Sequence, residues 1–291
     1  MAKVARLLFP ADISDLCASA IPNFAKLAKQ LGAELTVLHV VDTSGFYYDV
    51  MDVTYRRMCD IEAEKLAAVR KQFESFVSRL SICLPVRSVV KSGKIADTIA
   101  SYAETEKYDA ILLPTTHHNR LYSAMKKSLT AKLMDDSNAA IWTIDSAQVD
   151  RGTGGGCVIC ALACHQSQPL DESNRNIIDT ARFVAEKFGS GLVFLHVVEK
   201  GDAGSAGGDS ASSLKQQLQE ICETTSSNAK YRLENGDVPR AISEVAWQEN
   251  ATLLITGRNH RQALFGATQS RILDTVHLAP CPVLSVVRTP R

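Results

Sequence analysis

Two serine residues stand where a bound anion would be stabilised. Ser128 and Ser270 each begin a predicted helix, over Lys127–Met134 and Ser270–His277. A helix N-terminus presents free backbone N–H groups, and a hydroxyl beside them favours a phosphate or another anion. Basic residues that would neutralise such an anion lie nearby in the sequence: Lys126, Lys127, Arg258, Arg261 and Arg271. The alternative is that both serines are plain N-caps and the basic side chains are solvated.

A second group of residues, Cys157-x2-Cys160-x3-Cys164-His165, has the composition of a metal or redox cluster. It lies in the apolar run Cys157–Ala163, which predicts a buried strand, where residues three apart point to opposite faces. Tetrahedral metal sites with this spacing need a turn between the cysteines. We therefore expect no metal site here. A reactive thiol is the better hypothesis for Cys164, at the carboxyl end of the strand.

The sequence does not predict an enzyme. It contains no Gly-x4-Gly-Lys-Ser/Thr loop, no Gly-x-Ser-x-Gly elbow and no His-Glu-x2-His motif. No pair of carboxylates stands out as an acid/base couple. Lys plus Arg and Asp plus Glu are equal at 32 each, so the charge favours neither nucleic acid nor an anionic membrane as partner. No apolar run reaches the length of a membrane span, and no signal peptide is recognisable, so we expect a cytoplasmic protein.

The chain carries these residues in two copies of one unit. Gly93–His117 aligns without a gap on Gly236–His260, because both ends differ by 143 residues (236 − 93 = 260 − 117 = 143). Leu-His-Val-Val occurs at Leu38–Val41 and again at Leu195–Val198. We infer a tandem duplication of a unit of about 140 residues, near the usual size of one domain. His117 and His260 coincide in this alignment; a switch or ligand role is one interpretation, and local packing in an inherited loop is the favoured one.

Each half predicts alternating strands and helices, and therefore a doubly wound parallel α/β sheet. The predicted domains are 1–146 and 157–291, joined by a glycine-rich linker over 147–156, and a low-complexity surface loop is expected at Gly201–Ser213. The predicted strands are Val4–Phe9, Leu35–Val41, Val86–Val90, Ala110–Leu113 and Ala140–Ile144 in the first half, and Cys157–Ala163, Leu192–Val198, Leu253–Thr256 and Val283–Val287 in the second. The predicted helices include Ile61–Leu80, Ile177–Phe188 and Leu214–Ser226.

The order of these elements, the strand ending His-Val-Val and the Ala-Pro-Cys-Pro-Val before the last strand resemble the universal stress proteins. The resemblance covers nearly the whole chain as two tandem Rossmann-like copies. In nucleotide-binding members, the loop after strand four reads Gly-x2-Gly-x9-Gly-Ser/Thr, and an aspartate after strand one meets the adenine base. Separate copies pair through their last strands. The resemblance thus implies an intramolecular pseudo-dimer in which Ala140–Ile144 and Val283–Val287 are antiparallel neighbours.

The first half departs from that pattern at the phosphate loop. Pro114, His117 and Lys127 fall on the three glycines, and Ser128 falls on the hydroxyl residue. Glycine lets backbone N–H groups approach a phosphate closely, whereas Pro114 has no N–H and a fixed φ. Asp12 matches the aspartate that meets adenine. The first half is therefore expected to keep the base side and to lack the phosphate cradle.

The second half departs in the opposite sense. Gly257 is kept, while His260 and Gln269-Ser270 fall on the other motif positions and one residue is missing between them. The loop after its first strand, Cys164-His165-Gln166-Ser167, has no carboxylate at the equivalent of Asp12. The residues expected to contribute to binding are Asp12, Val40, Ser128, Val197, Gly257, Arg258, His260 and Ser270.

These departures favour a stress-response protein that senses or scaffolds rather than catalyses. A first alternative is an adenine-nucleotide binder, with ATP or AMP in the second domain and slow hydrolysis. A second alternative is a protein that binds another small anion or an acyl ligand in the altered sites. A small-molecule nucleotide is the expected partner under the first alternative, no other cofactor is implied, and pairing of two chains into a homodimer is a further possibility.

Overall fold

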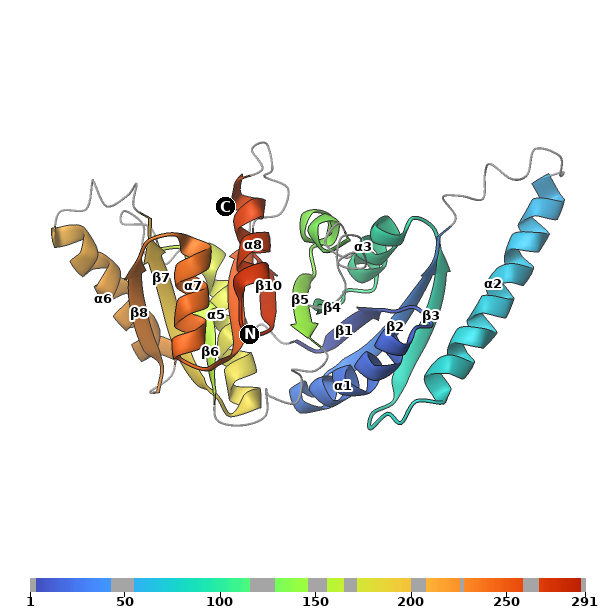
Figure 1. Ribbon diagram of the computed structural model, residues 1–291, viewed down its shortest axis with the longest axis horizontal. Coiled ribbons are helices and arrows are strands. Elements are labelled where there is room, and N and C mark those ends of the chain that lie inside the picture. The colour runs from blue at the N-terminus through green and yellow to red at the C-terminus, as the bar shows by residue number, and fades with distance from the viewer. Residues whose placement is uncertain are drawn as a thin grey trace. The chain divides into compact units, whose positions relative to one another are not determined.

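The computed structural model describes residues 4–42, 55–115, 129–145, 156–164, 172–199, 208–225, 228–258 and 267–288. The chain divides into two compact units. We call residues 5–139 the N-terminal unit, and residues 140–291 with the first four residues the C-terminal unit. Figure 1 gives the element labels used below.

The N-terminal unit is built on parallel strands in the order β3-β2-β1-β4. Their bounds are β1 Arg6–Pro10, β2 Glu34–Val41, β3 Val86–Ser92 and β4 Ala110–Thr115, and the helices between them are α1 Asp15–Leu31, α2 Tyr55–Ser78 and α3 Ile95–Thr105. Residues 129–136 are also helical. Strands β1 and β2 have runs of buried apolar residues, as expected for a parallel sheet with helices on both faces. Their carboxyl ends therefore meet at one edge, where ligands of such sheets lie.

The C-terminal unit has the strand order β5-β10-β9-β6-β7-β8. Its strands are β5 Ala140–Asp145, β6 Cys157–Ala161, β7 Gly191–Val198, β8 Lys230–Asn235, β9 Ala251–Arg258 and β10 Val283–Val287. Its helices are α5 Glu172–Phe188, α6 Gly208–Thr225, α7 Val238–Gln248 and α8 Ala267–Leu278, with α7 and α8 side by side (Figure 1). Helix α7 covers one face, where Ile242, Val245 and Ala246 pack on residues of β6, β7 and β9.

Strand register shows that the two units repeat one plan. Leu7 pairs with Leu35 and Ala110 in the N-terminal unit, and Val158 pairs with Leu192 and Leu253 in the C-terminal unit. Left-handed backbone conformations recur at the same places: Gly32 and Gly189, Gly93 and Gly236, Lys107 and Asn250. The duplication predicted from the sequence is thus visible in the backbone.

The last strands of the two sequence repeats pair as expected. β10 is antiparallel to β5, with Val283 opposite Thr143 and Leu284 opposite Trp142. The buried Thr143 hydroxyl also donates a 3.1 Å hydrogen bond to the carbonyl of Val283. This pairing places β5 in the compact unit with β10, although β5 belongs to the first sequence repeat. The linker over 147–156 lies outside the described residues except for Gly156.

Most predicted elements are present, with several differences. Strand β8 was not predicted, because Lys230, Arg232 and Glu234 interrupt its apolar pattern. Helix α6 begins at Gly208, so the predicted surface loop Gly201–Ser213 is wrong from that residue onward. Strand β6 ends at Ala161 rather than Ala163, and β1 begins at Arg6 rather than Val4. No helix of the described residues is long and apolar enough to span a bilayer.

Candidate functional site

Asp12 lies in the loop that follows β1, at the carboxyl edge of the N-terminal unit. Its side chain is exposed, and the Ser14 hydroxyl donates a hydrogen bond to its Oδ1. Ser14 is also the N-cap of α1 and accepts a 3.3 Å hydrogen bond from the Cys17 amide. Burial, aided by a hydrogen bond to the Asp12 carboxylate, raises the pKa of the Cys17 thiol to about 11. Asp12 is therefore held in place by the first turn of α1.

The histidine at the end of the second strand anchors the same loop in both units. His39 Nδ1 lies 2.8 Å from the carbonyl oxygen of Ala11, and His196 Nδ1 lies 3.0 Å from that of Leu162. The His39 ring also stacks on Phe73 at 5.1 Å between centroids. Both histidines thus have a structural role. Their neighbours Val40 and Val197 lie at the same carboxyl edge, with Val197 buried.

These matched contacts identify the residue that replaces Asp12. The amide of Ala11 donates to Leu38, and the amide of Leu162 donates to Leu195, each at 2.8 Å. Ala11 and Leu162 are therefore equivalent, and so are the residues that follow them, Asp12 and Ala163. The equivalent of Asp12 is thus Ala163, one residue before the loop Cys164-His165-Gln166-Ser167 in which the sequence places it.

Pro114 and Gly257 occupy equivalent positions on β4 and β9. The equivalence follows from register, since Ile111 pairs with Leu8 and its counterpart Leu254 pairs with Ile159. Pro114 is buried near the end of β4 and offers no backbone N–H. His117 and Ser128 lie outside the described residues.

The space left by the absent side chain of Gly257 is filled by two neighbours. A β-carbon built there would contact Cδ1 of Ile177 and lie 2.6 Å from Nε of Arg288. Ile177 comes from α5, and Arg288 follows β10, where its amide donates a 2.8 Å hydrogen bond to the Arg258 carbonyl. Tight packing therefore accounts for the absence of a side chain at position 257. The backbone hydrogen bond keeps two basic residues, Arg258 and Arg288, side by side at the end of the sheet.

The remaining predicted residues of the second half are only partly brought together. Arg258 is buried at the end of β9, beside Gly257. Ser270 lies in the first turns of α8, and nothing further of its side chain is described; His260 lies outside the described residues. Arg271 forms an ion pair with Glu199, which follows β7, so that cation has a carboxylate partner.

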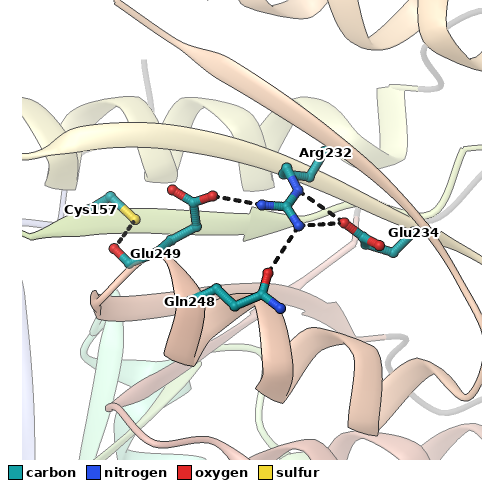
Figure 2. Close-up of polar contacts among 5 residues, drawn as sticks. All are labelled: Cys157, Arg232, Glu234, Gln248 and Glu249. Carbon is teal, nitrogen blue, oxygen red and sulfur yellow. Dashed lines mark hydrogen bonds and ion pairs between the residues drawn. The ribbon is translucent and has the colours of Figure 1, made fainter.

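The three cysteines of the Cys157-x2-Cys160-x3-Cys164 pattern do not converge. Cys157 begins β6 and donates a 3.4 Å hydrogen bond to the carbonyl of Glu249, whose carboxylate belongs to a network with Arg232, Glu234 and Gln248 (Figure 2). Cys160 is fully buried, and Cys164 lies beyond the other end of the strand. Among the described residues, no three His, Cys, Asp or Glu side chains form a group that could hold a metal ion.

Burial also governs the chemistry of Cys164. It raises the pKa of this thiol to about 11, and the nearby Arg288 charge offsets only part of that rise. A thiol with such a pKa is protonated at neutral pH, and the thiolate is the nucleophile. The raised pKa thus opposes the hypothesis of a reactive Cys164.

Sequence reasoning missed three residues at this end of the C-terminal unit: Asn174, Ile177 in its packing role, and Arg288. Asn174 and Ile177 are one helical turn apart and lie on the same side of α5. Asn174 is buried, and its Nδ2 donates a 2.9 Å hydrogen bond to the carbonyl of Ala163. An asparagine at the start of an apolar helix face was the available signal. We call Ala163, Cys164, Asn174, Ile177, Gly257, Arg258 and Arg288 the C-terminal site.

Comparison with known proteins places this architecture in a family. The model of the universal stress protein family matches residues 3–144 and 170–287. A universal stress protein of Methanocaldococcus jannaschii is 20% identical over 48% of this chain and 81% of its own length. The chain belongs to the universal stress protein family, as two tandem copies of its domain.

Solved structures show the same fold over the whole chain. A universal stress protein from Archaeoglobus fulgidus superposes with a TM-score of 0.70 at 18% identity, covering 97% of this chain and 96% of that one. A putative universal stress protein from Pseudomonas aeruginosa gives 0.61 at 16% identity, covering 98% and 94%. The predicted tandem α/β architecture is confirmed.

Proposed function

We propose that this universal stress protein is a cytoplasmic sensor or scaffold rather than a catalyst, and that any small ligand it senses binds at the C-terminal site. One observation carries the proposal: each unit retains a different side of the family's nucleotide site. The N-terminal unit has Asp12 with Pro114, and the C-terminal unit has Ala163 with Gly257. Neither unit combines a base-side carboxylate with a glycine at the phosphate side.

The charges support the choice of the C-terminal unit. Arg258 ends β9 there and Arg288 follows the neighbouring strand β10, whereas the residue equivalent to Arg258 in the N-terminal unit is Thr115. An arginine guanidinium is a preferred partner of phosphate and carboxylate groups. A ligand with an anionic group is therefore better accommodated at the C-terminal site.

Titration calorimetry with AMP and ATP tests this proposal. We expect Ala163→Asp to tighten AMP binding by about tenfold to a hundredfold, since it restores a charged acceptor whose hydrogen bond is worth about 1.5–3 kcal/mol. Asp12→Ala, the change at the equivalent position of the N-terminal unit, is the matched control and should leave binding unaltered. Micromolar ATP binding by the unchanged protein that Asp12→Ala abolishes would contradict the proposal, since it would place the ligand in the N-terminal unit.

A second candidate function is adenine-nucleotide binding in the C-terminal unit with slow hydrolysis. The observation that favours it is Gly257, the one motif glycine that the chain retains, adjoining Arg258. Release of inorganic phosphate from ATP, lowered by substitution of Arg258 and unaffected by Asp12→Ala, would support this alternative over the first.

A further inference from the structure

Asn174 holds a buried hydrogen-bond acceptor at the C-terminal site that the protein itself leaves unused. Its side chain is 4% exposed, and its Oδ1 has no hydrogen-bond partner within the described residues. The assignment of the amide is not arbitrary, because the carbonyl of Ala163 accepts from the other atom, which must then be Nδ2. A buried acceptor without a partner costs free energy, so a fold that keeps one calls for an explanation.

The residue that bears this acceptor is hydrogen-bonded to the residue at the position of the missing carboxylate. Ala163 is the equivalent of Asp12, and Asn174 is the equivalent of Cys17, because α1 and α5 end at the matching glycines Gly32 and Gly189 (189 − 32 = 174 − 17 = 157). In the N-terminal unit the Cys17 thiol is hydrogen-bonded to Asp12. In the C-terminal unit Asn174 contacts the residue that replaces Asp12. Helix α5 thus brings a carboxamide oxygen to the neighbourhood of position 163, where the side-chain carboxylate is absent.

The same face of α5 also contacts Gly257, the residue that falls on a glycine of the family's phosphate loop. Ile177, three residues after Asn174, contacts Gly257, and Arg288 lies against the same glycine. The Arg288 charge also acts on the Cys164 thiol, where it offsets part of the rise in pKa that burial causes. The Asn174 acceptor and the two arginines therefore lie at the same end of the C-terminal unit, on elements that contact one another.

We propose that Asn174 Oδ1 accepts a hydrogen bond from an N–H group of a ligand whose anionic group binds Arg288, the arginine that lies on the α5 side of the sheet. The proposal rests on the proposed function, since it names the chemical class that the C-terminal site takes. The carboxamide oxygen of Asn174 is an uncharged acceptor, so it can bind an N–H group of a ligand that carries no positive charge. Because the oxygen is buried in the ligand-free protein, binding must open this end of α5.

The test compares AMP with purine riboside 5′-monophosphate, which lacks only the amino group, by titration of the full chain. We expect AMP to bind about tenfold more tightly. Asn174→Cys, which copies the residue of the N-terminal unit, should remove this preference and retain the weaker binding. Cys17→Asn, the reciprocal change, is the control and should leave the preference intact.

The outcomes separate this proposal from the one on which it rests. Equal affinities for the two nucleotides in the unchanged protein would overturn the role of Asn174 and leave ligand binding at the C-terminal site standing. Binding of neither nucleotide would overturn both. If Asn174→Cys fails to fold, Asn174→Ser provides a second variant, and a preference for AMP that persists in a folded variant would also overturn the proposal.

Discussion

The contact between the first helix and the end of the neighbouring strand combines a large and a small residue in both units, but the order is reversed. In the C-terminal unit a large helix residue, Ile177, faces a strand residue without a side chain, Gly257. At the equivalent positions the N-terminal unit has a small helix residue, Ala20, and a larger strand residue, Pro114, both buried. Because interiors are close-packed, each choice requires the other. The change at the phosphate side is thus coupled to a change on the first helix.

Gly257→Ala should destabilise the protein by about 1–3 kcal/mol, the usual cost of adding a methyl group to a well-packed core. Gly191→Ala is the matched control, since its β-carbon would meet only Cys157 Cβ at 3.8 Å. Urea unfolding measures both. Combining Gly257→Ala with Ile177→Ala should cost less than the sum of the single changes, and strict additivity would contradict the packing account of Gly257.

Cys164 should react slowly with a thiol reagent at pH 7.5 and faster as the pH approaches 11, because its folded pKa of about 11 leaves little thiolate at neutral pH. Since an unfolded thiol has a pKa of about 8.5, the stability linked to this group is present below that pH and is lost as the pH rises toward 11. Cys83, which is exposed, is the reference, compared through Cys164→Ala and Cys83→Ala. Fast modification of Cys164 at neutral pH would restore the hypothesis of a reactive thiol.

At the scale of elements, the joint between the third strand and the following helix is the most strictly repeated feature. Gly93 and Gly236 adopt φ values of 142° and 140°, and their amides donate 3.0 Å hydrogen bonds to Val41 and Val198. Side chains disfavour this conformation. The alignment of Gly93 with Gly236 already marked the joint in the sequence, because a glycine kept in both copies signals such a conformation.

Replacing either glycine by alanine should destabilise its unit by about 1–3 kcal/mol through backbone strain. Gly93→Ala should cost more, because its β-carbon would lie 2.5 Å from Thr98 Oγ1, while that of Gly236 would meet nothing within 4 Å. Thermal unfolding measures the difference. Thr98→Ala should remove the excess cost of Gly93→Ala, and an undiminished excess would show that the steric contact is not its cause.

The predictable elements were those with one dominant signal. β10 was predicted with its observed bounds, Val283–Val287, since it is apolar and preceded by two prolines. β8 was missed because it alternates charged residues. Its Arg232 pairs with Glu234 on the same strand and gains a partner outside the strand only when the end of α7 brings Glu249 beside it (Figure 2). Asn174 was missed for a similar reason: its equivalence to Cys17 and its contact with Ala163 depend on helix ends and register.

For the whole molecule, the sequence predicted the duplication and the pairing of the final strands, but compact units and sequence repeats do not coincide. β5 ends the first repeat and packs with the second, because its antiparallel partner is β10. The repeat in the sequence cannot indicate that β5 packs with the second repeat, because this depends on the strand with which β5 pairs in the folded protein. The predicted boundary at 146 and 157 describes the repeats and stays a prediction for the folding units.

The most direct test of the account is a crystal structure of the full chain grown with ATP. The account predicts no triphosphate at the carboxyl end of β4, because Pro114 offers no N–H there. Any bound ligand should instead lie near Gly257, Arg258 and Arg288. Adenine on Asp12 together with a triphosphate held by backbone N–H groups beyond Pro114 would contradict it.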